Sequence, residues 1–197
     1  MTKIKFGTDG WRAIIADDFT VENVKRVAWA TAQWLKQNYP QPSAVVGNDC
    51  RFAGQLFADT TAAVLASEGI KVFRSENAFV STPMVSLGTV AFKASAGIIL
   101  TASHNPASYN GYKIKASYGG PATPDMIEAV ENLIHDTIDL QLKPISAYQE
   151  EGLIELVDLE TLYVNKVEES FDMDLIRNSG LNWAYDAMYG AGQNVMR

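Results

Sequence analysis

The stretch AGIILTASHNPASYNGYKIK, residues 96–115, joins an apolar run to a loop rich in reactive side chains. Residues 96–100 are apolar apart from one glycine, as expected of a buried strand, and residues 111–115 follow as a second strand. The loop between the two strands carries Ser103, His104 and Asn105. Because it concentrates groups that can take part in chemistry, we treat it as a candidate functional loop.

Strand and helix patterns alternate around this pair. The sequence predicts strands at 3–6, 43–47, 70–74, 96–102 and 111–115, and helices at 20–38, 54–68, 81–93 and 123–137. Helices of this length between strands indicate an α/β fold. We expect a three-layer α/β/α domain, whose mixed or parallel sheet is covered on both faces.

The pattern becomes irregular after residue 143. We expect a strand at 154–157, a helix at 159–171 and another strand at 183–188 that runs into a glycine turn. Residues 1–140 are therefore assigned to one domain that carries the serine loop. Residues 141–197 are assigned to a linker and the beginning of a second, similar domain.

Composition narrows the class of protein. The 197 residues are 47% hydrophobic and 20% charged, with a net charge of −7, which disfavours a nucleic-acid-binding surface. The sequence has no apolar stretch long enough to cross a membrane and no apolar secretory core near its start, so we expect a cytoplasmic protein without a membrane partner. One cysteine and two histidines exclude an internal disulfide and disfavour a Cys- or His-based zinc site.

A serine hydrolase is disfavoured. His104 directly follows Ser103, and adjacent side chains usually diverge, so His104 is poorly placed as a general base for that serine. The G-x-S-x-G nucleophile motif is also absent.

Phosphate chemistry fits the loop better. Asn105-Pro106 and Asn110-Gly111 favour tight turns whose backbone N–H groups can hold an anion. Lys113 supplies a cation and a proton donor, and His104 can donate to a phosphate oxygen. With Arg12, these groups would stabilise the charge of a phosphate transferred at the serine.

The motif GTDGWR, residues 7–12, has two interpretations. It can be a glycine turn in which Asp9 accepts from local N–H groups. Alternatively, Arg12 supplies a bidentate phosphate contact at the end of the turn.

The loop after the predicted strand at 43–47 contains Asp49, Cys50 and Arg51. We expect Asp49 and Arg51 to form an ion pair that braces the strand-end loops. Cys50 is expected to pack as a small apolar residue.

Together these loops resemble the α-D-phosphohexomutase superfamily, which includes bacterial phosphoglucomutases and phosphomannomutases. The resemblance rests on TASHNP at 101–106 with NGYK at 110–113, on FGTDGWR at 6–12 and on GNDCR at 47–51. It spans residues 3–120. Residues 185–192, YDAMYGAG, also resemble the opening of the family's second domain.

The resemblance implies a reversible shift of phosphate between the 1- and 6-positions of glucose or mannose. Ser103 would be carried as phosphoserine, a hexose 1,6-bisphosphate would be the intermediate and activator, and Mg²⁺ would lie on the phosphate of Ser103. Lys113 would be the general acid/base, assisted by His104 and Arg12. Substrate contacts would come from Thr8, Arg12, Ser103 and Lys113, and support for the site from Asp9, Asp49, Arg51, Asn105 and Asn110.

The sequence also departs from the family pattern. Family members have four domains and more than twice this length, and their Asp-rich metal loop and sugar- and phosphate-binding loops are expected beyond Arg197. We therefore expect negligible turnover from the chain alone. The alternatives are a non-catalytic phosphate- or phosphosugar-binding module and, within the mutases, a phosphoglucosamine mutase. The oligomeric state is not predicted.

Overall fold

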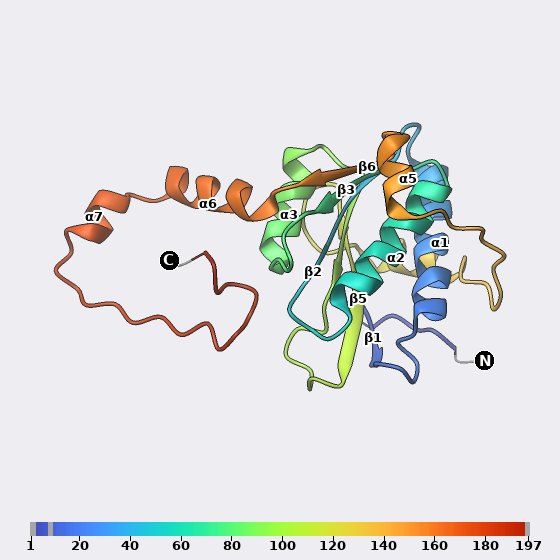
Figure 1. Cartoon of the computed structure of the whole chain (residues 1–197), viewed down its shortest axis with the longest axis horizontal. Coiled ribbons are helices and arrows are strands. Elements are labelled where there is room, and N and C mark those ends of the chain that lie inside the picture. Colours follow the sequence, from blue (N-terminus) through green and yellow to red (C-terminus); the bar gives the residue numbers. More distant parts are fainter. Residues whose placement is uncertain (1–2, 8–9, 196–197) are drawn as a thin grey trace.

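The computed structural model describes residues 3–7 and 10–195. Strands and helices alternate through the first half of the chain (Figure 1). In chain order the elements are β1 Trp11–Ile14, α1 Val21–Asn38, β2 Ser43–Asn48, α2 Gly54–Ser67, β3 Lys71–Ser75, α3 Thr82–Ala91, β4 Ala96–Leu100, β5 Tyr109–Ala116, α4 Pro124–Glu131, α5 Ile145–Glu150, β6 Ile154–Val157, α6 Leu159–Ser170 and α7 Met173–Arg177.

These strands form one mixed sheet of order β1-β5-β4-β2-β3-β6. Strand β2 is parallel to both β3 and β4, and β6 is parallel to β3. Strand β5 runs antiparallel to β4 and β1. The α/β class and the mixed sheet predicted from the sequence are confirmed.

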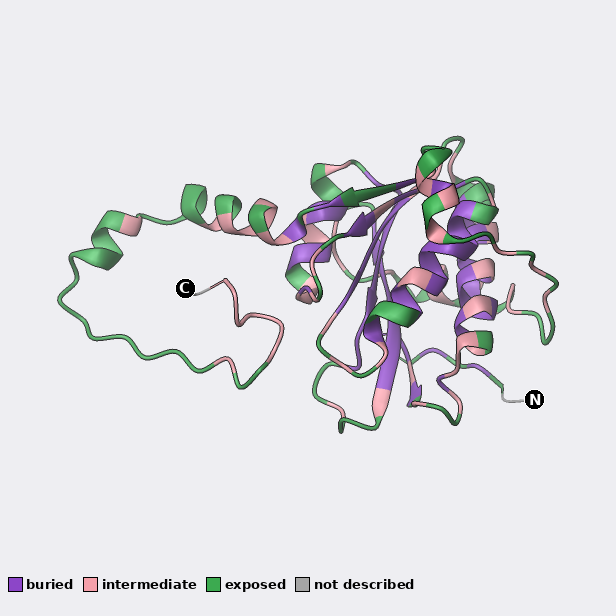
Figure 2. Ribbon diagram, viewed as in Figure 1, coloured by how far each residue is buried: buried purple, intermediate pink, exposed green. Residues whose placement is uncertain are grey.

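Each face of the sheet has its own hydrophobic core. In β2, Ala44 and Val46 join the core formed with α1, α2, α4 and α5, whereas Val45 points to the opposite face. This alternation follows from the two-residue period of a strand. Helix α3 and the start of α6 cover that opposite face. The sheet and the helix sides that meet it are buried (Figure 2), which confirms the three-layer arrangement.

Local capping explains where several helices begin and end. The side chain of Thr20, rather than that of Asp18, accepts from the backbone N–H of Asn23 at 3.2 Å and starts α1. Gly69, with φ +81°, follows α2 in the left-handed conformation that favours glycine. These two boundaries agree with the sequence prediction.

Three sequence predictions are wrong. The first strand is β1 and not residues 3–6, because the backbone of β1 pairs with β5, whereas Ile4 and Phe6 only pack into the core. Helix α4 ends at Glu131 and not at 137. Residues 183–188 are not a strand, since they have no strand partner in the part of the chain that the structure describes.

Residues beyond 140 contribute to the same sheet. Strand β6 extends its β3 edge, and Tyr148 of α5 is buried in the larger core. The predicted domain boundary at residue 140 stays a prediction. Helices α6 and α7 extend away from the sheet, and the segment that follows turns back toward it (Figures 1 and 2), so that Asn194 Nδ2 donates to Glu160 Oε2 at 3.2 Å. Among the described residues, no helix combines the length and apolar character needed to cross a membrane.

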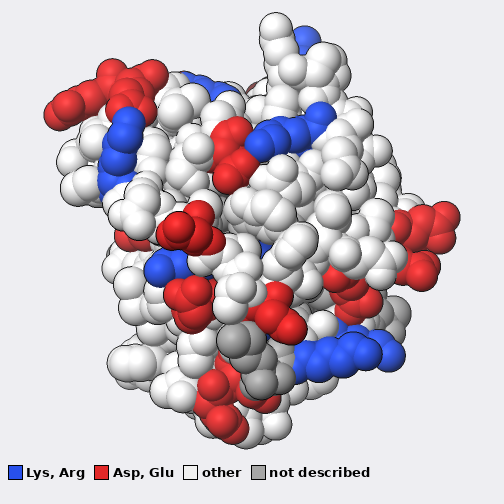
Figure 3. Space-filling view, turned by 90° about the vertical axis from the view of Figure 1, so that its right-hand side faces the viewer, with Lys and Arg blue, Asp and Glu red and all other residues white. Residues whose placement is uncertain are grey.

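Charged side chains of both signs are interspersed on the face shown in Figure 3. Lysine and arginine side chains there lie among aspartates and glutamates, so this face presents no continuous basic area.

Packing of α3 on β4 predicts the effect of a small substitution. A Cβ at Gly97 would lie 2.2 Å from Thr89 Oγ1 and 3.1 Å from Val85 Cγ1. We expect Gly97→Ala to lower the free energy of unfolding by about 1–3 kcal/mol, because the added methyl overpacks this contact. Adding Thr89→Ala should restore part of the loss in chemical denaturation. Strictly additive effects of the two substitutions would contradict this explanation.

Candidate functional site

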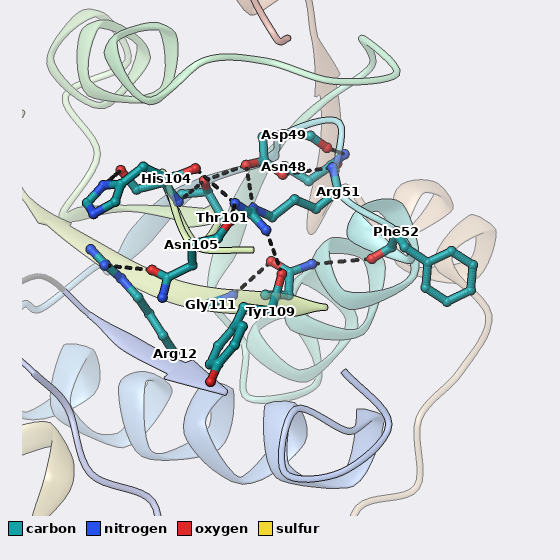
Figure 4. A network of polar contacts seen from close by, with 12 residues as sticks. Arg12, Asn48, Asp49, Arg51, Phe52, Thr101, His104, Asn105, Tyr109 and Gly111 are labelled. Carbon is teal, nitrogen blue, oxygen red and sulfur yellow. Dashed lines mark hydrogen bonds and ion pairs between the residues drawn. The ribbon is translucent and has the colours of Figure 1, made fainter. Parts of the chain in front are cut away.

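Two loops meet where β2 and β4 end. These strands are parallel, with Asn48 opposite Leu100, and the N–H of Asp49 donates to the carbonyl of Leu100 at 3.0 Å. Residues 49–53 therefore lie beside residues 101–108 (Figure 4). Ligand sites of open α/β sheets commonly lie beyond the carboxyl ends of the strands, which is where these two loops lie.

The guanidinium of Arg51 holds the serine loop. Nη1 and Nη2 donate to four backbone carbonyl oxygens, those of Pro106 (2.8 Å), Tyr109 (2.9 Å), Ser103 (2.9 Å) and Asn105 (2.6 Å). Its Nε lies 3.6 Å from Asp49 Oδ2, which confirms the predicted ion pair. A guanidinium has five N–H donors, so Arg51 is committed to the protein rather than to a ligand.

Asp49 connects the same loop by a second route. Its Oδ1 accepts from the backbone N–H of Arg51 at 2.9 Å, and its Oδ2 accepts from the hydroxyl of Thr101 at 2.5 Å. The Thr101 oxygen in turn accepts from the backbone N–H of Ser103 at 3.1 Å. These contacts fix the backbone on the N-terminal side of the serine.

Ser103 and His104 are both exposed at the tip of the loop. Ser103 has φ +56°, and its Oγ lies 3.4 Å from His104 Nδ1. The two side chains are closer than their adjacency predicted, although the contact is long for a hydrogen bond. Among the described residues, no carboxylate bonds to His104, so the serine–histidine–acid arrangement of a hydrolase is not formed there.

Arg12 and Lys113 share one face of the β1–β5 pair. Arg12 lies opposite Gly111, and Lys113 is two residues further along β5, so both side chains leave the sheet on the same side. Arg12 Nη1 donates to Asn105 Oδ1 at 2.9 Å, which ties this face to the serine loop. Lys113 is 5% exposed, and the backbone at Gly10 packs against its stem.

Asn110 forms hydrogen bonds at the C-terminal end of the serine loop. It is fully buried, its Oδ1 accepts from the N–H of Gly111 at 2.8 Å, and its Nδ2 donates to the carbonyl of Phe52 at 3.4 Å. A Cβ at Gly111 would lie 2.5 Å from the carbonyl oxygen of Thr101. Glycine is therefore required where β5 passes the end of β4.

Cys50 corrects one prediction. It is exposed, not packed as a small apolar residue, because the loop turns its side chain outward. Partial burial raises the pKa of its thiol, and the Asp49 carboxylate raises it further, so the reactive thiolate is disfavoured.

Thr8 and Asp9, two residues that the sequence assigned to the site, lie outside the described residues. Thr101 and Lys115 were missed by the sequence reasoning. Lys115 is 7% exposed and shares its face of β5 with Lys113, as the alternation Lys-Ile-Lys could have indicated. Nothing in the sequence marked the hydroxyl of Thr101 as a link between Asp49 and Ser103.

A hollow of about 480 Å³ opens beside the loop tip and is lined in part by Arg51, Phe52, Ser103 and Asn105. The exposed hydroxyl of Ser103 and imidazole of His104, with the guanidinium of Arg12 in contact with Asn105 of the same loop, suit an anionic reactant. This arrangement can support transfer of a phosphate to or from the serine.

Comparison with known proteins decides the family. The family model for phosphoglucomutase/phosphomannomutase, alpha/beta/alpha domain I, matches residues 3–140. The chain belongs to the phosphoglucomutase/phosphomannomutase family. The sequence-based resemblance to the phosphohexomutases is therefore confirmed.

Relatives within this family differ in their named sugar. The chain is 33% identical over 193 residues to a phosphoglucomutase of Staphylococcus saprophyticus, covering 93% of this chain and 33% of the relative. It is 31% identical over 191 residues to a phosphoglucosamine mutase of Carboxydothermus hydrogenoformans, covering 96% and 42%. The crystal structure of a Thermus thermophilus protein described as a phosphomannomutase superposes with a TM-score of 0.80 at 32% identity, covering 89% of this chain and 38% of that one. The chain thus spans between one third and about two fifths of the length of these relatives.

Replacing Arg51 by lysine tests its hold on the loop. A single ammonium has three donors at one nitrogen and cannot reach four carbonyl oxygens in the way that a planar guanidinium does. We expect Arg51→Lys to lower the free energy of unfolding by about 1–3 kcal/mol and to speed amide hydrogen exchange at Asn105 and Tyr109. The control substitution Arg177→Lys, at an exposed residue, should change neither the free energy of unfolding nor the amide hydrogen exchange of the loop. Unchanged amide hydrogen exchange at Asn105 and Tyr109 in Arg51→Lys would argue against the role of Arg51 in holding the loop.

Proposed function

We propose that this chain is the phosphoryl-carrying part of a phosphohexomutase, with Ser103 as the residue that carries the phosphate. The observation that carries the proposal is the exposed Ser103 hydroxyl on a loop whose carbonyl oxygens are turned toward Arg51. Binding the carbonyls in this way directs their negative partial charge away from the serine. Membership of the phosphoglucomutase/phosphomannomutase family supports the same interpretation.

In the proposed reaction, the bond between phosphorus and Ser103 Oγ breaks as a sugar hydroxyl oxygen bonds to phosphorus. The hydroxyl proton passes to the general acid/base and from there to Ser103 Oγ, so that the serine leaves phosphorus as a neutral hydroxyl. The resulting hexose 1,6-bisphosphate then returns its other phosphate to the serine, which regenerates the phosphoserine and releases the isomeric monophosphate. Atoms and charge balance over the cycle without a further reactant.

Three side chains receive roles in this proposal. Lys113 is the general acid/base, since it lies on the same face of the β1–β5 pair as Arg12 and little of it is exposed to solvent. Arg12 binds the phosphate from the neighbouring strand, and its contact with Asn105 sets its distance from the loop. His104, 3.4 Å from Ser103 Oγ, donates to the transferred phosphate.

The family resemblance implies that Mg²⁺ takes part in the activity. Whether this chain fits the ion depends on which of its side chains could act as ligands. Among the described residues, no group of three or more His, Cys, Asp or Glu side chains could hold a metal ion. Ser103 and its phosphate alone do not form a magnesium site. The described residues do not fit a complete site, so no step is routed through the metal.

The preferred sugar is proposed only as a class. Glucose and mannose phosphates remain the leading substrates, and glucosamine phosphate is the runner-up, in keeping with the differing names of the relatives. A small phosphosugar as partner, no nucleic acid or membrane partner, a cytoplasmic location and a second domain after residue 140 are parts of the same proposal.

Phosphate on Ser103 is the decisive prediction. We expect protein purified from its native source to carry phosphate on this residue, as measured by intact mass and peptide mapping, because the proposed cycle starts and ends on phosphoserine. Ser103→Ala should abolish the modification, whereas Ser108→Ala in the same loop should retain it.

Protein that is fully unmodified at Ser103 in its native source would overturn the mutase proposal and favour a phosphate-binding module. The interconversion of glucose 1-phosphate and glucose 6-phosphate, followed on the same preparation in the presence of Mg²⁺, then tests whether the phosphate turns over.

A further inference from the structure

The backbone of Ser103 adopts a conformation that serine rarely takes. Its φ of +56° lies in the left-handed region, where the Cβ of an ordinary residue meets steric resistance. A non-glycine residue persists there when its surroundings impose the geometry. The contacts that impose it also set the direction in which Oγ leaves the loop.

Both peptide groups flanking Ser103 are held. Its N–H donates to Thr101 Oγ1 at 3.1 Å, and its carbonyl accepts from Arg51 Nη2 at 2.9 Å. Thr101 is only 4% exposed and immediately follows β4, so its oxygen is fixed relative to the sheet. The serine is exposed, whereas Thr101 is buried and the side chain of Arg51 is only 12% exposed.

The Thr101 hydroxyl donates one hydrogen bond and accepts another, from two different partners. A hydroxyl has a single proton, and in Thr101 this proton is donated to Asp49 Oδ2 at 2.5 Å. A lone pair of the same oxygen is then left to accept from the N–H of Ser103. Asp49 is itself positioned by the backbone N–H of Arg51 at 2.9 Å. The carboxylate therefore determines which way the hydroxyl points.

We propose that Thr101 is a positioning residue, whose hydroxyl links Asp49 to the Ser103 N–H and thereby aims Ser103 Oγ for phosphoryl transfer. The inference rests on the proposed function of Ser103 and adds the residue that controls its geometry. It also means that the N–H of Ser103 is used within the loop. Phosphate on Oγ must then be stabilised by neighbouring side chains rather than by that amide.

Two substitutions at Thr101 and one control separate the effect of losing the hydroxyl from the effect of changing the side-chain volume. Thr101→Val keeps the shape but removes the hydroxyl, and Thr101→Ser keeps the hydroxyl. Thr61→Val is the matched control, because Thr61 is equally buried and its hydroxyl donates only to the carbonyl of Phe57 within α2, at 2.8 Å. If Thr101→Val does not fold, Thr101→Cys against Thr101→Ser makes the same comparison, because sulfur is a weak acceptor.

The first readout is the backbone of Ser103 itself, measured by NMR on the full 197-residue chain. We expect Thr101→Val to speed amide exchange at Ser103 by about tenfold or more and to shift its Cα resonance, because the hydrogen bond at its N–H is lost. Thr101→Ser and Thr61→Val should resemble the wild type. A Ser103 amide that is unchanged in Thr101→Val, or equally disturbed in Thr101→Ser, would overturn the proposal.

The second readout is the rate at which Ser103 gains phosphate from glucose 1,6-bisphosphate with Mg²⁺, followed by intact mass. We expect Thr101→Val to slow it by about tenfold or more, and Thr101→Ser to stay within a few fold of the wild type. An unchanged rate in Thr101→Val would count against positioning. If the wild type gains no phosphate, the proposed function loses support for this chain, and the NMR comparison still decides the role of Thr101.

Discussion

One guanidinium organises the end of the sheet where the reactive residues lie. Arg51 belongs to the loop after β2, yet its N–H groups donate to carbonyl oxygens of the loop after β4 and of the first residue of β5. This is possible only because β2 and β4 are parallel neighbours that end together. A loop of this kind would otherwise leave several carbonyl groups to be satisfied by water, and its tip would sample many conformations. The position of Ser103 follows from this single side chain and its partner Asp49.

Much of the fold was predictable because local signals agree with the tertiary structure. The side chain of Thr20, the glycine at 69 and the apolar runs of β2 and β4 each act within a few residues. Strand β1 was missed because its existence depends on pairing with β5, about a hundred residues away in sequence. The predicted strand at 183–188 was wrong for the opposite reason. Its sequence has the pattern of a strand, but among the described residues no strand pairs with it.

The sequence could propose the residues of the site, but it could not give their geometry. The loop motif identified Ser103, and the charges of Asp49 and Arg51 indicated an ion pair. The sequence could not show that Arg51 binds backbone carbonyl oxygens, because every residue carries such a group and none is distinctive. The link through Thr101 was hidden for a similar reason, since a threonine after a strand is common. The exposure of Cys50 depended on the path of the loop, which its neighbours do not reveal.

The two faces of β5 have opposite chemical character. Tyr112 and Ile114 pack into the larger core, while Lys113 and Lys115 leave the other face. A shift of pairing by one residue would bring ammonium groups into the apolar core and move the large apolar side chains out of it. The length of the serine loop can therefore vary in evolution or by engineering only if β5 keeps its register. A single-residue insertion or deletion within β5 would therefore destabilise the fold, and any change in the length of the loop must also preserve the contacts of Arg51 with its carbonyl oxygens.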